Sequence, residues 1–149
     1  MSQFLLMRKA FLLTTLVFVL DFVFGTAVAL ALGLSDPAIG SARNNWFANG
    51  TPLSAPGIFM VLYGVFLLLA TRQRWIGTIG IVGITLLTLI SGVASIADMN
   101  ITQQVFEHHL TLLTALPLVV AFVTIPIVII LGILTLMLQV RARTHPAIS

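Results

Sequence analysis

Asp21 is the side chain that most needs a chemical explanation, because it is a carboxylate near the middle of a long apolar segment. An ionisable group at membrane depth is costly, and such groups mark proton or cation sites, contacts with partners, or buried hydrogen bonds. No Lys, Arg or His lies within the long apolar segments, so no intrachain cation is expected at this depth. We therefore expect Asp21 to be protonated, to border a water-filled cavity, or to meet a cation from a ligand or partner subunit.

Three other polar side chains fall at a similar depth. At helical rise, Asp21 lies about 16 Å above the start of its segment, and Thr85 and Thr88 lie about 15 and 20 Å above the start of theirs. Tyr63 is slightly lower, but its hydroxyl is long enough to reach the same level. We predict that these four residues form one buried polar layer, a ligand or proton site in which Asp21 donates to Thr85 or Thr88. The favoured interpretation of Asp21 is a hydrogen-bonded staple between the first and third helices, and a contact with a partner subunit is a further alternative.

Glu107, His108 and His109 form the chain's other cluster of polar groups. Adjacent residues on a helix point in different directions, and the two-histidine spacing of a zinc protease is absent, so we predict no metal site. The cluster is kept as a weak candidate for an outer-face metal. No set of nucleophile, base and orienting residue is visible, and neither is a phosphate-binding loop. We expect no cofactor, and the sequence favours a protein that is not an enzyme.

Composition indicates which kind of protein must position these groups. Apolar residues make up 59% of the 149-residue chain and charged residues 7%, whereas soluble domains contain about 25% charged residues. The length suits one domain, which we expect to cover residues 1–149 as a single transmembrane unit. The absence of cysteine excludes a disulfide framework and a thiolate metal site.

Four apolar segments predict an all-α fold, a four-span transmembrane helical bundle. Crossing a bilayer takes about 20 helical residues, and the segments cover approximately residues 10–34, 53–70, 75–97 and 117–140. Ser54 is expected to cap the second helix and Pro56 to occupy its first turn. Pro117 is expected to separate an interfacial turn from the fourth span, in which Pro126 marks a candidate bend.

The basic residues predict the orientation of the bundle. Six of the seven are expected on one side, namely Arg8, Lys9, Arg72, Arg74, Arg141 and Arg143, and the opposite side has only Arg43. The positive-inside rule then places the N and C termini in the cytoplasm. The compact connections suit a multi-pass protein of a bacterial cell membrane. Because the basic residues lie at segment ends, the composition does not indicate binding to nucleic acid.

Small residues predict how the helices pack, since close backbone approach drives helix association in lipid. Gly25, Ala29 and Gly33 form a stripe on the first span, and Asp21 extends it by one turn. The third span has the richest small and polar surface, so we expect it to be central, with the first span packed against it. Its small and polar residues are Gly77, Gly80, Gly83, Thr85, Thr88, Ser91, Gly92 and Ser95. We expect the connection over residues 35–52 to be irregular, with Trp46 and Phe47 anchoring it at the membrane interface.

The leading functional hypothesis is a small integral membrane protein without enzymatic activity. It would act as an accessory or assembly subunit, or as a small-ligand-binding module, and its partners would be lipid, other membrane subunits or a second copy. The alternative is a proton- or cation-coupled small transporter that uses Asp21. A second alternative is a membrane enzyme with a metal at the outer face.

Overall fold

The computed structural model describes residues 2–36, 40–97 and 111–144, and nearly all of these are helical. The elements are α1 (Gln3–Leu32), β1 (Ser35–Asp36), β2 (Gly40–Ser41), α2 (Ala42–Asn49), α3 (Ile58–Thr71), α4 (Arg74–Ala97) and α6 (Leu112–Thr144). The two short strands pair antiparallel. The prediction of an all-helical chain is therefore confirmed, apart from this one small hairpin.

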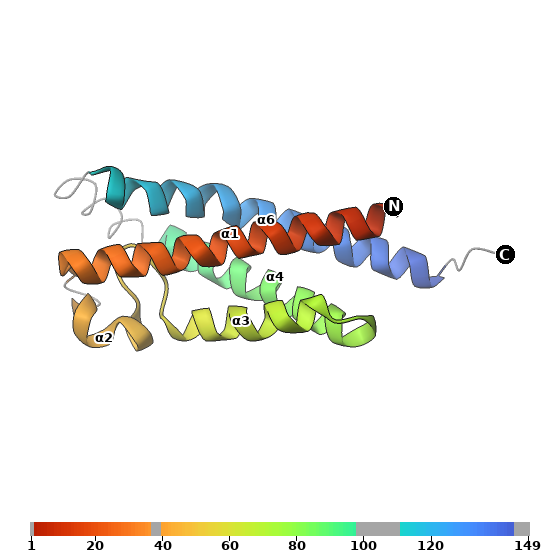
Figure 1. The fold of residues 1–149 in the computed structure, drawn as a ribbon, viewed down its shortest axis with the longest axis horizontal. Helices are drawn as coiled ribbons and strands as arrows, with labels where there is room; N and C mark the ends of the chain where they lie inside the picture. The colour runs from red at the N-terminus through yellow and green to blue at the C-terminus, as the bar shows by residue number, and fades with distance from the viewer. Residues whose placement is uncertain (1, 37–39, 98–110, 145–149) are drawn as a thin grey trace.

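The helices α1, α3, α4 and α6 run alternately in opposite directions, and both ends of the chain lie at the end of the bundle that holds the α3–α4 turn (Figure 1). α1 packs along α6 and also touches α3, while α4 packs along α3 and α6. α1 and α4 therefore lie diagonally across the bundle. The first span was expected to pack directly on the third, but α6 is the main neighbour of α1, and α1 meets α4 through side chains of the core.

Three helices, α1, α4 and α6, are long and apolar enough to cross a membrane. α3 has 14 residues, so it is only about 21 Å long and falls short of the hydrocarbon thickness. It begins at Ile58 rather than at the predicted residue 53. The residue before it, Gly57, provides no side-chain cap, so the prediction of a cap at Ser54 is also wrong.

α6 is continuous through both of its prolines, so the predicted separation at Pro117 is wrong. Proline removes one backbone hydrogen bond to the residue four positions earlier. For Pro117 this acceptor is the Leu113 carbonyl, so α6 lacks one bond of its ladder there but remains helical. The ring also packs, because a Cβ added to Gly25 would lie 3.3 Å from Pro117 Cβ.

The surface of the bundle is apolar, whereas several buried side chains are polar. Leu13, Leu68, Val93 and Ile96 are each more than 60% exposed. Inside, buried threonines donate to carbonyls of their own helices at 2.7–2.9 Å, as Thr15 does to Phe11. An apolar exterior of this extent is unusual for a soluble monomer. With the three long apolar helices, it indicates a membrane protein.

Glycines bring the backbones of α3 and α4 into direct contact. A Cβ on Gly80 would collide with the backbone of Ala70, and one on Gly83 would collide with the Phe66 ring. At Gly77 the added atom would strike the carbonyl of Arg72. Because these glycines recur every third residue, they lie on one face of α4, and this face packs closely against α3 and the turn that follows it.

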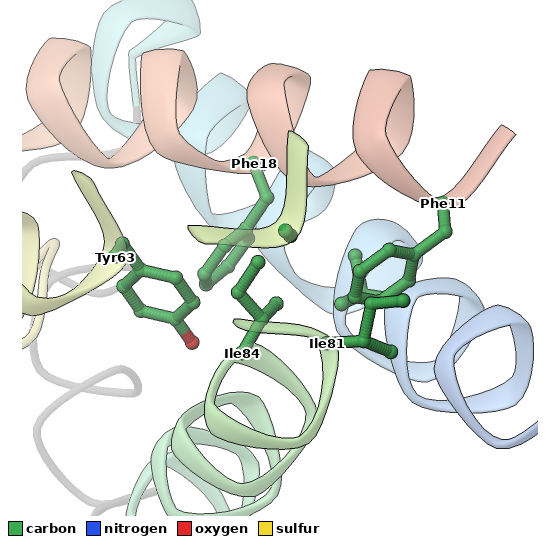
Figure 2. Close-up of a cluster of buried hydrophobic side chains, with 7 residues drawn as sticks. Phe11, Phe18, Tyr63, Ile81 and Ile84 are labelled. Atoms are coloured by element: carbon green, nitrogen blue, oxygen red, sulfur yellow. The ribbon is translucent and has the colours of Figure 1, made fainter. Parts of the chain in front are cut away.

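A core shared by the four long helices fills the bundle on the side of the termini. Phe11 and Phe18 point from α1 towards Ile81 and Ile84 of α4, with Tyr63 of α3 beside them (Figure 2). The rings of Phe18 and Tyr63 meet edge to face, with centroids 5.5 Å apart. All five side chains are buried.

Two arginines close helix C-termini, where the unpaired carbonyls favour a cation. Arg8 donates to the Ala70 carbonyl through Nη2 at 2.7 Å and through Nε at 3.3 Å, and it also donates to the Arg72 carbonyl. At the other end of the bundle, Arg43 Nε donates to the Leu30 carbonyl at 3.1 Å. The side chain of Arg8 thereby ties α1 to the α3–α4 turn.

Within the described part of residues 35–49, two short paired strands and α2 are formed, so the prediction of an irregular segment is wrong for these residues. The first residues of this connection follow Gly33, which has φ 62° and ends α1. The N–H groups of Gly33 and Leu34 donate to the Leu30 and Ala29 carbonyls, as in a Schellman motif. Gly33 is therefore a helix terminus, whereas Gly25 and Ala29 are packed against neighbouring segments.

We predict that Gly80→Ala destabilises the protein by about 1–3 kcal/mol, because the added methyl group forces two backbones apart. Gly64→Ala is the matched control, since it lies on α3 with nothing within 4 Å of the added Cβ. It should match or exceed the native stability, because alanine favours a helix more than glycine does. Equilibrium unfolding in detergent would measure both, and equal stabilities for the two variants would contradict the close contact.

Candidate functional site

A cavity of about 350 Å³ lies in the half of the bundle away from the chain termini. It is bordered by α1, α3, α4 and α6 and by the segment that joins α2 to α3. The described residues that line it are Phe18, Asp21, Phe22, Asn49, Thr51, Pro52, Leu53, Ser54, Ala55, Pro56, Phe59, Ile90, Ser91, Ala94, Ser95, Leu118, Ala121, Phe122 and Ile125. Asp21 is the one titratable group in this set.

The cavity exists because α3 is short. Tyr63 of α3 lies opposite Thr88 of α4, with 2.9 Å between their hydroxyl oxygens. Phe59, one turn earlier on α3, therefore reaches the level of Ser91, and α4 continues for a further six residues to Ala97. No helical turn of α3 covers that stretch, so the irregular segment before Ile58 covers it and leaves space behind.

Hydroxyl groups fix this covering segment in place. Ser54 Oγ lies 2.8 Å from Thr26 Oγ1 of α1 and 2.7 Å from Thr51 Oγ1. The backbones of Thr51 and Ser54 also pair with each other, and the Gly57 N–H donates to the Trp46 carbonyl. These hydroxyls border the cavity, but they are already hydrogen-bonded to one another.

Asp21 borders the cavity with a half-buried side chain. Among the residues that the structure describes, none donates a hydrogen bond to its carboxyl group or forms an ion pair with it. Thr85 and Thr88, its predicted partners, donate instead to the Ile81 and Ile84 carbonyls at 2.8 Å. The predicted hydrogen bond from Asp21 to these threonines is thus not formed.

Ser91 is a buried polar group of the cavity without a hydrogen bond, whereas Asn49, which also lines the cavity, is exposed. Its side chain is 6% exposed, and its Oγ has no hydrogen-bonding partner within the described part of the chain. The Tyr63 hydroxyl approaches it, but without hydrogen-bond geometry. Ser95, one turn later, does bond back to the Ser91 carbonyl at 2.8 Å. A buried hydroxyl without a partner is costly, so Ser91 is an available donor and acceptor.

The predicted polar layer separates into three places. Tyr63 and Thr88 form a closed pair in the core, and Thr85 lies against Gly132 of α6. Asp21 borders the cavity instead, together with Ser91, whose hydroxyl has no hydrogen-bonding partner among the described residues. The depth estimate placed these groups at similar heights, but it contained no information about the direction in which each side chain points.

Four phenylalanines make the cavity aromatic. Phe18 and Phe22 come from the same face of α1 as Asp21, while Phe59 and Phe122 come from α3 and α6. The sequence signal for Ser91 and Ser95 was their position on the small, polar face of the third span. Nothing in the sequence indicated Phe59, Phe122 or the covering segment, because their approach depends on tertiary packing.

The described residues contain no group of three or more potential metal ligands. The weak metal candidates Glu107, His108 and His109 lie outside the described residues. Comparison of the chain with protein-family models, curated proteins and solved structures finds no match.

We predict that Tyr63 and Thr88 have a structural role. Tyr63→Phe and Thr88→Val should each cost about 1 kcal/mol, and the double variant should cost less than the sum, because the two changes remove the same hydrogen bond. A double-mutant cycle of unfolding free energies in detergent measures this coupling. Strictly additive losses would show that the hydroxyl pair contributes nothing to stability.

Proposed function

We propose that this chain is a four-span membrane protein that binds a small ligand in the outer half of its bundle. Both termini would lie in the cytoplasm, and the cavity would lie toward the opposite face of a bacterial cell membrane. The distribution of basic residues supports this orientation, since six of the seven belong to the helix ends and turn on the side of the termini.

One observation carries the binding proposal: Asp21, which is half-buried, and Ser91, which is buried, border the same aromatic cavity without hydrogen-bonding partners among the described residues. Other buried hydroxyls of the long helices, such as those of Thr88 and Thr135, bond to carbonyls of their own helices. Ligand pockets are typically apolar, with a few polar groups that fix orientation. A volume of about 350 Å³ falls at the lower end of the usual range for such pockets.

Binding is favoured over transport by the packing of the inner half. A Cβ on Gly132 would collide with Thr85 and lie 3.1 Å from the Phe11 ring, so α1, α4 and α6 meet there without space. The transporter alternative keeps Asp21 as the coupling group, but it needs these contacts to separate during each cycle. The accessory-subunit role remains compatible with ligand binding, because the exposed apolar faces are available to other membrane helices.

We predict that α3 crosses the membrane despite its length. Because the chain has no cysteine, single replacements at Asn45 and Gln73 can be labelled selectively. In intact cells, an impermeant maleimide should label Asn45→Cys in α2, and it should label Gln73→Cys in the α3–α4 turn only after permeabilisation. Ser2→Cys is the internal reference and should behave like Gln73→Cys. Outside labelling of Gln73→Cys would exclude the four-span arrangement.

We also predict that the cavity retains a small molecule when the protein is extracted gently from its own membrane. Native mass spectrometry should show added mass on the native protein and on Val93→Phe, whose side chain points outward at 61% exposure. Ala94→Phe, which places a ring in the cavity, should lose that mass while keeping its unfolding midpoint. The same adduct on all three proteins would contradict binding at this site.

A further inference from the structure

Among the described residues that line the cavity, Asp21 is the one ionisable group and has no countercharge. Arg43, the one arginine at this end of the bundle, donates to carbonyls at the end of α1. The other described basic residues belong to the opposite end. An ionised Asp21 would therefore be compensated by whatever occupies the cavity.

The remaining lining indicates which kind of cation fits. Aromatic faces attract cations, and quaternary ammonium groups are typical ligands of sites lined by aromatic rings. Phe18, Phe22, Phe59 and Phe122, from three helices, line the same cavity as this carboxylate. A metal ion would require several oxygen or nitrogen ligands, and the described residues hold no such group. The phenylalanines would contribute nothing to its coordination.

Size and the second polar group narrow the class further. About 350 Å³ accepts one ring or a short branched chain attached to the charged group. The unpaired Ser91 hydroxyl can bond to one polar atom on the ligand. The hydroxyls of Thr51 and Ser54 already bond to each other, so they make the rim of the cavity polar without requiring a hydrogen bond from the ligand.

We propose that the ligand is a small organic cation, with an ammonium group beside Asp21 and an apolar body among the phenylalanines. This inference rests on the proposed function and adds the chemical class of the ligand. If the proposal holds, the affinity of the cavity for a ligand depends on the ligand's charge and not on its shape alone.

The test compares benzyltrimethylammonium with its uncharged carbon isostere, neopentylbenzene. Equilibrium dialysis of the full chain in lipid nanodiscs, against empty nanodiscs of the same lipid, removes the contribution of lipid partitioning. The cation should bind at least about tenfold more tightly than the isostere, as expected for a desolvated charge contact. Asp21→Asn should abolish the preference by weakening the cation alone, and Asp21→Glu should retain it.

The controls separate failure of this inference from failure of the proposed function. Val93→Phe should keep the preference, and unfolding midpoints should show that each variant is folded. Equal binding of both probes, unchanged by Asp21→Asn but lost in Ala94→Phe, would overturn the charge inference and leave the ligand-binding function standing. Binding of neither probe would also overturn it, and the extracted-ligand experiment would then decide whether the cavity binds another class of molecule.

Discussion

The contact between α3 and α4 through Gly77, Gly80 and Gly83 determines where the rest of the structure lies. In lipid there is little hydrophobic drive for helices to associate, so stability depends on van der Waals contact over a closely matched surface. The three glycines let the α3 backbone rest on α4, and this fixes the register that pairs Tyr63 with Thr88. The same register leaves the last turns of α4 beyond the beginning of α3. The cavity is therefore a consequence of the close contact between α3 and α4.

Hydrogen bonding explains why Asp21 and Ser91 stand out. A backbone or hydroxyl group in a membrane protein must find its partner inside the protein, and the threonines of the long helices do so through carbonyls one turn earlier. Even the irregular segment before α3 satisfies its polar groups, through the Thr51–Ser54 bridge and the bond from Gly57 to Trp46. Because most buried polar groups nearby are hydrogen-bonded, the lack of partners for the half-buried Asp21 and the buried Ser91 distinguishes this cavity from the rest of the bundle.

The sequence predicted the elements better than their partners. Hydropathy and the basic residues predicted four apolar segments, and the span expected over residues 75–97 agrees with α4 to within one residue. Gly25 lies against Leu53 and Pro117, and Ala29 lies in a cluster with Leu53 and Leu118, but composition could not show which segments these small residues would meet. Predictions of helix ends were wrong where hydrogen bonds between distant segments determine the end. Ser54 looked like a cap, yet its hydroxyl is bonded to Thr26 of another helix.

The candidate site was predicted only in part, for a related reason. The cost of a carboxylate in an apolar segment identified Asp21 without any knowledge of the fold. Depth along a helix then grouped it with Thr85 and Thr88, because length is available from sequence whereas rotation around the helix axis relative to a neighbour is not. Ser91 became recognisable only once its missing hydrogen bond could be compared with the bonds made by Ser95 and Thr88.

The unequal helix lengths also affect the lipid around the molecule. α1 has 30 residues and is about 45 Å long, whereas α3 is about 21 Å long, against a hydrocarbon layer of about 30 Å. In the proposed four-span arrangement, hydrophobic mismatch would be concentrated on the α3 side, where the bilayer would have to thin at a cost of fractions of a kcal/mol per Å. Shorter-chain lipids would gather along this side, and a neighbouring protein with an equally short helix would relieve the same deformation. The short α3 that leaves a cavity inside the bundle would thus also make the deformation of the surrounding bilayer unequal, with the greatest thinning on the α3 side.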